Sequence, residues 1–167
     1  MKAKGSPTKV LFDSLARLYK QGQLLLLDGD RLMGEREWVP MHTTAPGEFS
    51  NSLNSPQRWY ARWAVRFYGP AILEQEQGMT DRLLFISIHF ASDHDTPDVD
   101  EPVVSAGRLQ YDKAMNEKTA DASYEYWMCK SYFWGEPHKT LEGWQCLDKP
   151  RFAKNLKRIE SIRSPTV

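Results

Sequence analysis

The stretch from Trp59 to Tyr68 constrains the fold more than any other part of the chain, because two kinds of side chain alternate along it. One set of alternate positions is apolar: Trp59, Ala61, Trp63, Val65 and Phe67. The other set is basic and aromatic around one alanine: Tyr60, Arg62, Ala64, Arg66 and Tyr68. Successive strand residues point to opposite faces of a sheet, so the pattern predicts a strand with a core face and a basic, aromatic face. A helix would also align Trp59, Trp63 and Phe67, but the aromatic content and the Gly69-Pro70 stop favour a strand.

Two later segments repeat this alternation. Residues 82–90 place Leu84, Ile86 and Ile88 on one face, and residues 102–111 form a second apolar run. The 11-residue stretch between them, residues 91–101, is mainly acidic and polar and predicts an antiparallel pair joined by a long loop. Residues 121–134 and 144–147 are two further candidate strands.

The N-terminal part of the chain has helical rather than strand periodicity. Its apolar or small positions recur at steps of three and four residues: Leu11, Leu15, Leu18, Gly22, Leu25, Gly29, Leu32 and Met33. This stripe predicts one long helix from Thr8 to Glu35, in which Gly22 and Gly29 let another backbone approach closely. The alternative is a break near Gly22, with Leu24–Leu27 as a strand and Asp28-Gly29 as a turn.

A second, shorter helix is predicted at the C-terminus, where Pro150 precedes apolar residues at Phe152, Leu156 and Ile159. The predicted fold class is therefore α+β. A long N-terminal helix packs on a mainly antiparallel sheet of three to five strands, with the shorter C-terminal helix beside it. Residues 1–167 form a single domain, with a loose N-terminus at 1–7, a long polar loop at 42–57 and a loose C-terminus at 164–167.

The overall composition excludes several classes of protein. The net charge is zero, so the whole molecule has no field that attracts nucleic acid, and any such binding requires a local patch. The two cysteines are too few for a disulfide framework, and no apolar leader follows Met1, which predicts a cytoplasmic protein. The longest apolar run, Leu24–Leu27, is far below the roughly 20 residues that cross a bilayer, so no membrane association is predicted.

The basic and aromatic strand face is the first candidate binding site. Tyr60, Arg62, Arg66 and Tyr68 combine guanidinium groups with aromatic rings, a pairing that stacks bases and neutralises phosphates. His89 lies near a strand end, and the C-terminal segment adds Lys154, Lys157 and Arg158. The alternative is structural, because arginine and tyrosine also pair across strands or with nearby carboxylates.

Two candidate metal sites are weaker. His89, Asp93, His94 and Asp95 bring imidazole and carboxylate groups together near the acidic loop, but no calcium-hand register fits, and a solvated loop is the favoured explanation of the charges. Cys129, His138 and Cys146 supply zinc-type ligands, but a structural zinc site needs four ligands, and these three lack the close paired spacing. No cofactor is predicted.

No nucleotide-binding loop, nucleophile elbow or zinc-protease motif occurs in the sequence. We therefore expect a small non-enzymatic binding or accessory protein that acts through protein–protein contacts, and a homo-oligomer is compatible with this expectation. The first alternative is a nucleic-acid-binding protein that uses the basic strand face and the basic C-terminal helix. The second is a divalent-metal-dependent hydrolase centred on His89 and the acidic loop.

Overall fold

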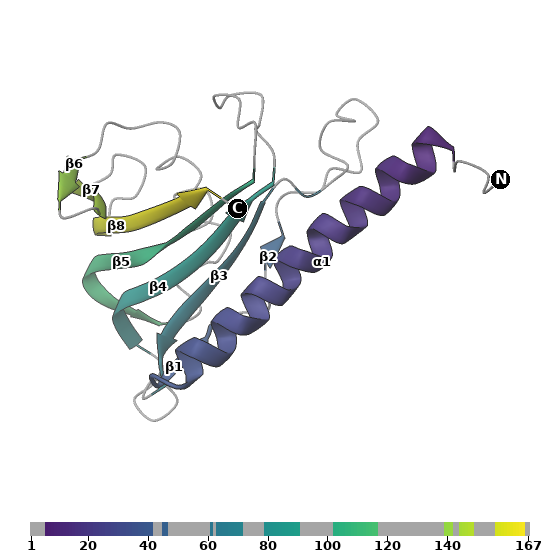
Figure 1. Cartoon of the computed structure of the whole chain (residues 1–167). Coiled ribbons are helices and arrows are strands. Elements are labelled where there is room, and N and C mark those ends of the chain that lie inside the picture. The colour runs from purple at the N-terminus through teal and green to yellow at the C-terminus, as the bar shows by residue number, and fades with distance from the viewer. Residues whose placement is uncertain are drawn as a thin grey trace, which may run out of the picture.

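The computed structural model describes residues 6–41, 45–46, 61, 63–71, 79–90, 102–116, 139–141, 144–148 and 156–165. These residues form one helix and eight strands, arranged as a helix lying across one face of a curved sheet (Figure 1). The elements in chain order are α1 (Pro7–Gly34), β1 (Trp38–Pro40), β2 (Ala45–Pro46), β3 (Trp63–Pro70), β4 (Met79–His89), β5 (Val103–Asn116), β6 (Lys139–Leu141), β7 (Trp144–Asp148) and β8 (Leu156–Pro165). The α+β class and the antiparallel sheet are confirmed.

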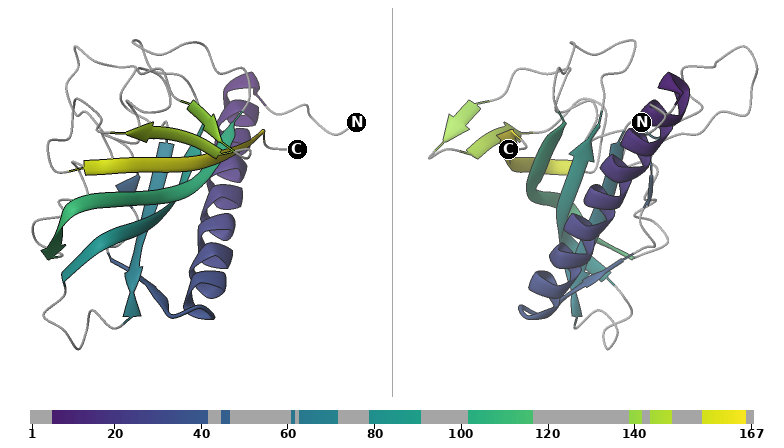
Figure 2. Two further views of the ribbon diagram at one scale, coloured as in Figure 1. Left: turned by 90° about the vertical axis from the view of Figure 1, so that its left-hand side faces the viewer. Right: turned by 45° about the vertical axis from the view of Figure 1, so that its right-hand side comes forward.

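Every strand pairing in the sheet is antiparallel. The strand order is β1-β3-β4-β5-β8-β7-β6, and β2 pairs with β3 beyond the end of β1. Five strands have five residues or more, and the three short strands β1, β2 and β6 extend the sheet at its two edges. β6, β7 and β8 lie on the side of the sheet away from α1 (Figure 2).

α1 is one continuous helix of 28 residues, which confirms the long N-terminal helix. Pro7 stands at its first turn, where a missing N–H leaves no hydrogen bond unmade. The alternative break near Gly22 does not occur, and Leu24–Leu27 is helical. The first turns of α1 extend beyond the ends of the strands (Figure 1), and Val10, Leu11 and Phe12 are exposed there.

Gly22 and Gly29 are buried, and they let the helix approach the sheet closely. A Cβ added at Gly22 would lie 2.8 Å from Cζ of Phe90, and one added at Gly29 would lie 2.6 Å from Cδ1 of Ile86. Carbon atoms at these distances overlap, so a larger residue at either position would have to displace the end of the Phe90 or Ile86 side chain. The close approach expected from the sequence is present, although the neighbouring atoms belong to side chains and not to backbone.

Both faces of the central strands contribute to the core. On the face toward α1, Ala64, Arg66 and Tyr68 of β3 align with Ile88, Ile86 and Leu84 of β4. On the far face, the buried residues are Trp63, Val65, Phe67, Leu83, Phe85, Ser87, His89, Leu109, Tyr111 and Ile159. In the described part of the 59–68 segment, the predicted core residues Trp63, Val65 and Phe67 are thus buried, and Arg66 and Tyr68 of the predicted basic and aromatic face lie beneath α1.

The predicted C-terminal helix is not confirmed, because residues 156–165 form β8 between β5 and β7. A β-bulge explains why the segment resembles a helix. The register shifts so that Leu156 pairs with Tyr111 and Ile159 pairs with Leu109, whose two side chains share the far face. An extra residue therefore places two positions three apart on the same face of a strand, which mimics helical spacing. Residues 150–155, including Phe152, lie outside the described residues.

The remaining predicted segments agree with the structure where it describes them. β4 and β5 form the predicted antiparallel pair, and β7 contains the predicted strand at 144–147. The predicted loop at 42–57 includes the two-residue strand β2 and otherwise lies outside the described residues, as do the acidic loop and the candidate strand at 121–134. β8 continues to Pro165, within the C-terminal end expected to be loose.

Candidate functional site along the helix

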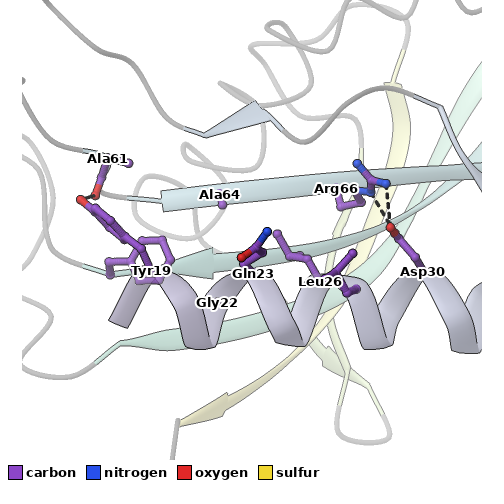
Figure 3. Close-up of a pocket in the computed structure, with 10 residues that line it drawn as sticks. Tyr19, Gly22, Gln23, Leu26, Asp30, Ala61, Ala64 and Arg66 are labelled. Atoms are coloured by element: carbon purple, nitrogen blue, oxygen red, sulfur yellow. Dashed lines mark hydrogen bonds and ion pairs between the residues drawn. The ribbon is translucent and has the colours of Figure 1, made fainter. Parts of the chain in front are cut away.

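A pocket of about 460 Å³ lies between α1 and β3 (Figure 3). Its walls are Tyr19, Gly22, Gln23, Leu26, Leu27, Asp30, Ala61, Ala64, Arg66 and Phe90. The volume falls within the range of small-molecule sites, and the lining is mainly apolar with polar groups at the two ends, which is the usual character of such a site.

At one end of the pocket, Asp30 of α1 is held by Arg66 of β3 (Figure 3), and Tyr68 of the same strand also contacts it. Arg66 Nε donates to Asp30 Oδ1 at 2.9 Å, and Arg66 Nη2 donates to Asp30 Oδ2 at 2.7 Å. The Tyr68 hydroxyl donates to Oδ1 at 3.0 Å. Two-point pairing between guanidinium and carboxylate is strong and directional, so this network fixes the C-terminal half of α1 on the sheet.

The Tyr68 phenol is fully buried beside this ion pair. Burial raises the pKa of Tyr68 well above its ordinary value, and the negative charge of Asp30 raises it further. Tyr68 therefore stays protonated at neutral pH and continues to donate to Asp30. Arg66 and Tyr68, two of the four residues of the predicted basic and aromatic face, thus contact a carboxylate of the chain itself.

At the other end of the pocket, Tyr19 fixes the helix to the start of β3. Its hydroxyl donates to the carbonyl oxygen of Ala61 at 2.7 Å. Its ring meets Phe90 edge-on, with ring centroids 5.2 Å apart and planes at 71°. Together with the Asp30 network, this contact attaches α1 at two points, about three turns apart along the helix axis.

A second, more apolar groove runs along the opposite side of α1, toward β5. Two adjoining pockets of about 560 and 320 Å³ share Gln21, Leu25 and Val104. The helix contributes Leu18, Leu24, Leu25 and Leu32, and the sheet contributes Ile86, Ile88, Phe90, Val104 and Ala106. The groove therefore joins an uncovered side of the helix to an uncovered part of the sheet.

The four consecutive leucines of α1 face four different directions, and the sheet covers one of them. Leu26 is 6% exposed, whereas Leu24, Leu25 and Leu27 are 49%, 37% and 53% exposed. A helix that is apolar on all sides is normally buried on all sides. Leu27 lines the pocket beside β3 and Leu25 lines the groove toward β5, with Leu24 between them on the side of the helix away from the sheet. These three leucines form a wide exposed arc, which we call the outer leucine surface of α1.

His89 lies on the far face of the sheet, away from Arg66 and α1. Its Nε2 is 2.8 Å from the Ser87 hydroxyl, and both side chains are buried. A hydroxyl beside an imidazole has the composition of a nucleophile and its base. Both side chains are buried on the far face of the sheet, whereas the pocket and the groove lie on the face toward α1. Ser87 and His89 are therefore a hydrogen-bonded pair within the core.

The basic residues predicted on a C-terminal helix lie on strand β8 where they are described. Lys157 is exposed, and Arg158 Nε lies 2.9 Å from Glu160 Oε1. Glu160 also pairs with Arg108 of β5, so its carboxylate joins two arginines on the α1 side of the sheet. The positive charge expected from Arg158 is thus balanced within the sheet.

Several predicted site residues lie outside the described residues: Tyr60, Arg62, Asp93, His94, Asp95, Cys129, His138 and Lys154. Cys146 belongs to β7, with its backbone paired to that of Glu160. Within the described ranges, no group of three His, Cys, Asp or Glu side chains is arranged to hold a metal ion. No helix in the described part of the chain combines the length and apolar character needed to cross a membrane.

Asp30 and the outer leucine surface were missed as site residues from the sequence. Asp30 lies outside the predicted apolar stripe, 36 positions before its partner Arg66, and no local pattern relates the two residues. The leucines carried a usable signal, because four in succession must face every side of a helix. Comparisons with known protein families, curated proteins and solved structures find no match.

Proposed function

We propose that this protein is a non-enzymatic binding protein that acts through protein–protein contacts made by the outer leucine surface of α1. The observation that carries the proposal is the contrast between buried Leu26 and its exposed neighbours Leu24, Leu25 and Leu27. Exposed apolar side chains that cluster on one element mark interaction sites more often than isolated ones do.

The position of the surface supports the same function. Leu25 also lines the groove toward β5, so a partner could contact the helix and the sheet at once. An amphipathic helix laid into an apolar groove is a recurrent mode of protein recognition. The Asp30–Arg66 and Tyr19–Ala61 hydrogen bonds hold the helix in place, so it binds without first having to order.

The test compares proteins recovered from the source cells by the tagged wild type and by the double variant Leu24→Glu/Leu27→Glu. Each recovered protein is then purified and its Kd for both baits is measured. We expect at least one protein whose affinity falls tenfold or more, because a buried carboxylate without a partner is costly at an interface. Recovery of the same proteins with equal affinity by both baits would exclude the proposal.

The matched control is Lys113→Glu/Ala114→Glu, which places carboxylates at two exposed positions of β5. Its partners and their affinities should equal those of the wild type. Circular dichroism and thermal unfolding of both double variants check that the fold persists, as expected for changes at exposed positions.

A further inference from the structure

We propose that the partner of the outer leucine surface is a second copy of this chain, with the two α1 helices lying side by side in opposite directions. This inference rests on the proposed function and names its partner. It draws on the spacing of the exposed leucines, the charge distribution along the helix and the groove beside it.

The first observation is a leucine every seventh residue along α1, at Leu11, Leu18, Leu25 and Leu32. Seven residues are close to two helical turns, so these leucines form one continuous ridge. The periodicity of the sequence places the ridge on the buried side of the helix, yet Leu11, Leu25 and Leu32 are exposed in the single chain. The sheet of one chain therefore covers only part of the apolar side of its own helix.

The second observation is that the two halves of α1 carry opposite charge. Its first half has three basic residues, Lys9, Arg17 and Lys20, and one acidic residue, Asp13. The second half, with its cap, has Asp28, Asp30, Arg31 and Glu35. Even with Asp30 assigned to Arg66, the second half stays net negative.

This arrangement is unfavourable for an isolated helix. The N-terminal end of a helix carries a partial positive charge and prefers acidic residues, and the C-terminal end prefers basic residues. The first turn of α1 contains no acidic residue. A second α1 in the opposite direction would place acidic residues beside the basic half at both ends, which favours an antiparallel pair and disfavours a parallel one.

The groove toward β5 offers space for the second helix. It follows the ridge from Leu18 to Leu32, a length of about 21 Å at 1.5 Å per residue. Its floor is formed by Ile86, Ile88 and Val104 of the central strands. In a two-fold arrangement each ridge lies against the other, and each helix approaches the uncovered strands of the other sheet.

The primary experiment measures the mass of the purified full-length chain by sedimentation equilibrium over a range of concentrations. We expect twice the 19.3 kDa chain mass at high concentration and dissociation on dilution. A chain that stays monomeric up to about 100 μM, where a useful homodimer would be populated, would overturn the inference.

Charge variants at exposed positions then test the antiparallel direction. Arg17→Glu/Lys20→Glu makes both halves of the helix negative, and Asp28→Lys/Glu35→Lys makes both halves positive. We expect either double variant alone to weaken the dimer tenfold or more. The combined four-residue variant should recover wild-type affinity, because it exchanges the net charges of the two halves of the helix and restores their attraction. A dimer whose Kd changes in neither double variant would contradict the antiparallel helix pair.

Failure of this inference is distinguishable from failure of the proposed function. A monomeric chain that still binds another protein through Leu24 and Leu27 would refute the second copy as partner and leave the proposed function standing. A monomeric chain with no partner sensitive to these leucines would refute both.

Discussion

The two faces of the sheet are buried in different ways. On the far face, four apolar side chains are essentially inaccessible: Leu83 and Phe85 of β4, Leu109 of β5 and Ile159 of β8. Leu109 pairs with Leu83 on one side and with Ile159 on the other. On the face toward α1, the buried cluster is small, with Leu26, Ala64 and Ile88 at its centre, and grooves lie on both sides of the helix. The difference indicates that the far face supplies most of the packing energy, whereas the helix face leaves apolar surface available for binding.

The largest expected effect is at Phe85 on the far face, which is 0% exposed. Phe85→Ala should lower the free energy of unfolding by about 3 to 5 kcal/mol, because it removes a buried ring and leaves a cavity. Phe12→Ala makes the same chemical change at a side chain that is 65% exposed, and it should alter stability by less than about 0.5 kcal/mol. Urea denaturation of the two variants checks the contrast, and equal losses would contradict the description of the far face as the main core.

A smaller effect is expected on the helix face. Leu26→Ala should cost about 2 to 3 kcal/mol, near the lower end for buried leucine, because adjacent grooves let the site relax. Leu24→Ala, two residues away in the same helix, should cost less than about 0.5 kcal/mol at concentrations where the chain is monomeric. Thermal unfolding of both variants at low concentration makes the comparison. If Leu26→Ala lowered the free energy of unfolding as much as Phe85→Ala, the two faces of the sheet would contribute equally to stability, which would contradict the comparison.

The smallest expected effect concerns Tyr68 and appears at high pH. Tyr68→Phe should cost about 1 kcal/mol near neutral pH, through loss of the hydrogen bond to Asp30. The folded state raises the pKa of Tyr68 above its unfolded value of 10.0, so this side chain contributes its full stability below that pH and loses it progressively above.

The wild type should therefore lose more stability than Tyr68→Phe between about pH 9 and pH 11. Urea denaturation at both values measures this difference. Tyr19→Phe serves as the control, since it removes a phenol that donates to a backbone carbonyl and not to a carboxylate. A wild type and Tyr68→Phe variant that lose stability equally would show that the phenol is not held protonated by its surroundings.

The sequence predicts the local periodicities of this fold better than its long-range pairings. Alternation along 63–68, the described strand part of the 59–68 segment, and along 82–90 identifies the strands and separates their faces, because side-chain direction is a local property of the backbone. The bulge opposite Tyr111 is a property of two paired strands, so the period of residues 156–159 alone suggested a helix. The candidate site was hidden for the same reason: Arg66 and Tyr68 have a binding composition, and their partner Asp30 is distant in sequence.

The helix stripe shows a different limit of sequence analysis. Its period correctly identifies the apolar side of α1, with Gly22 and Gly29 against the sheet. The period does not show how much of this apolar side the sheet covers. Leu25 and Leu32 belong to the stripe, yet the chain's own sheet leaves them exposed. Apolar periodicity therefore identifies residues that become buried, without stating whether the same chain buries them.

Gly22 and Gly29 also fix where along its axis the helix can rest. Sliding α1 by three or four residues would bring Leu18, Leu25 or Leu26 over Phe90 and Ile86, where even one added carbon overlaps. Sliding by seven would return one glycine to a permitted position and place Leu15 or Arg36 at the other. The two glycines thus favour a single longitudinal position of the helix, because any other would displace the Phe90 or Ile86 side chain, and the side chains on its outer surface are held at one height above the sheet.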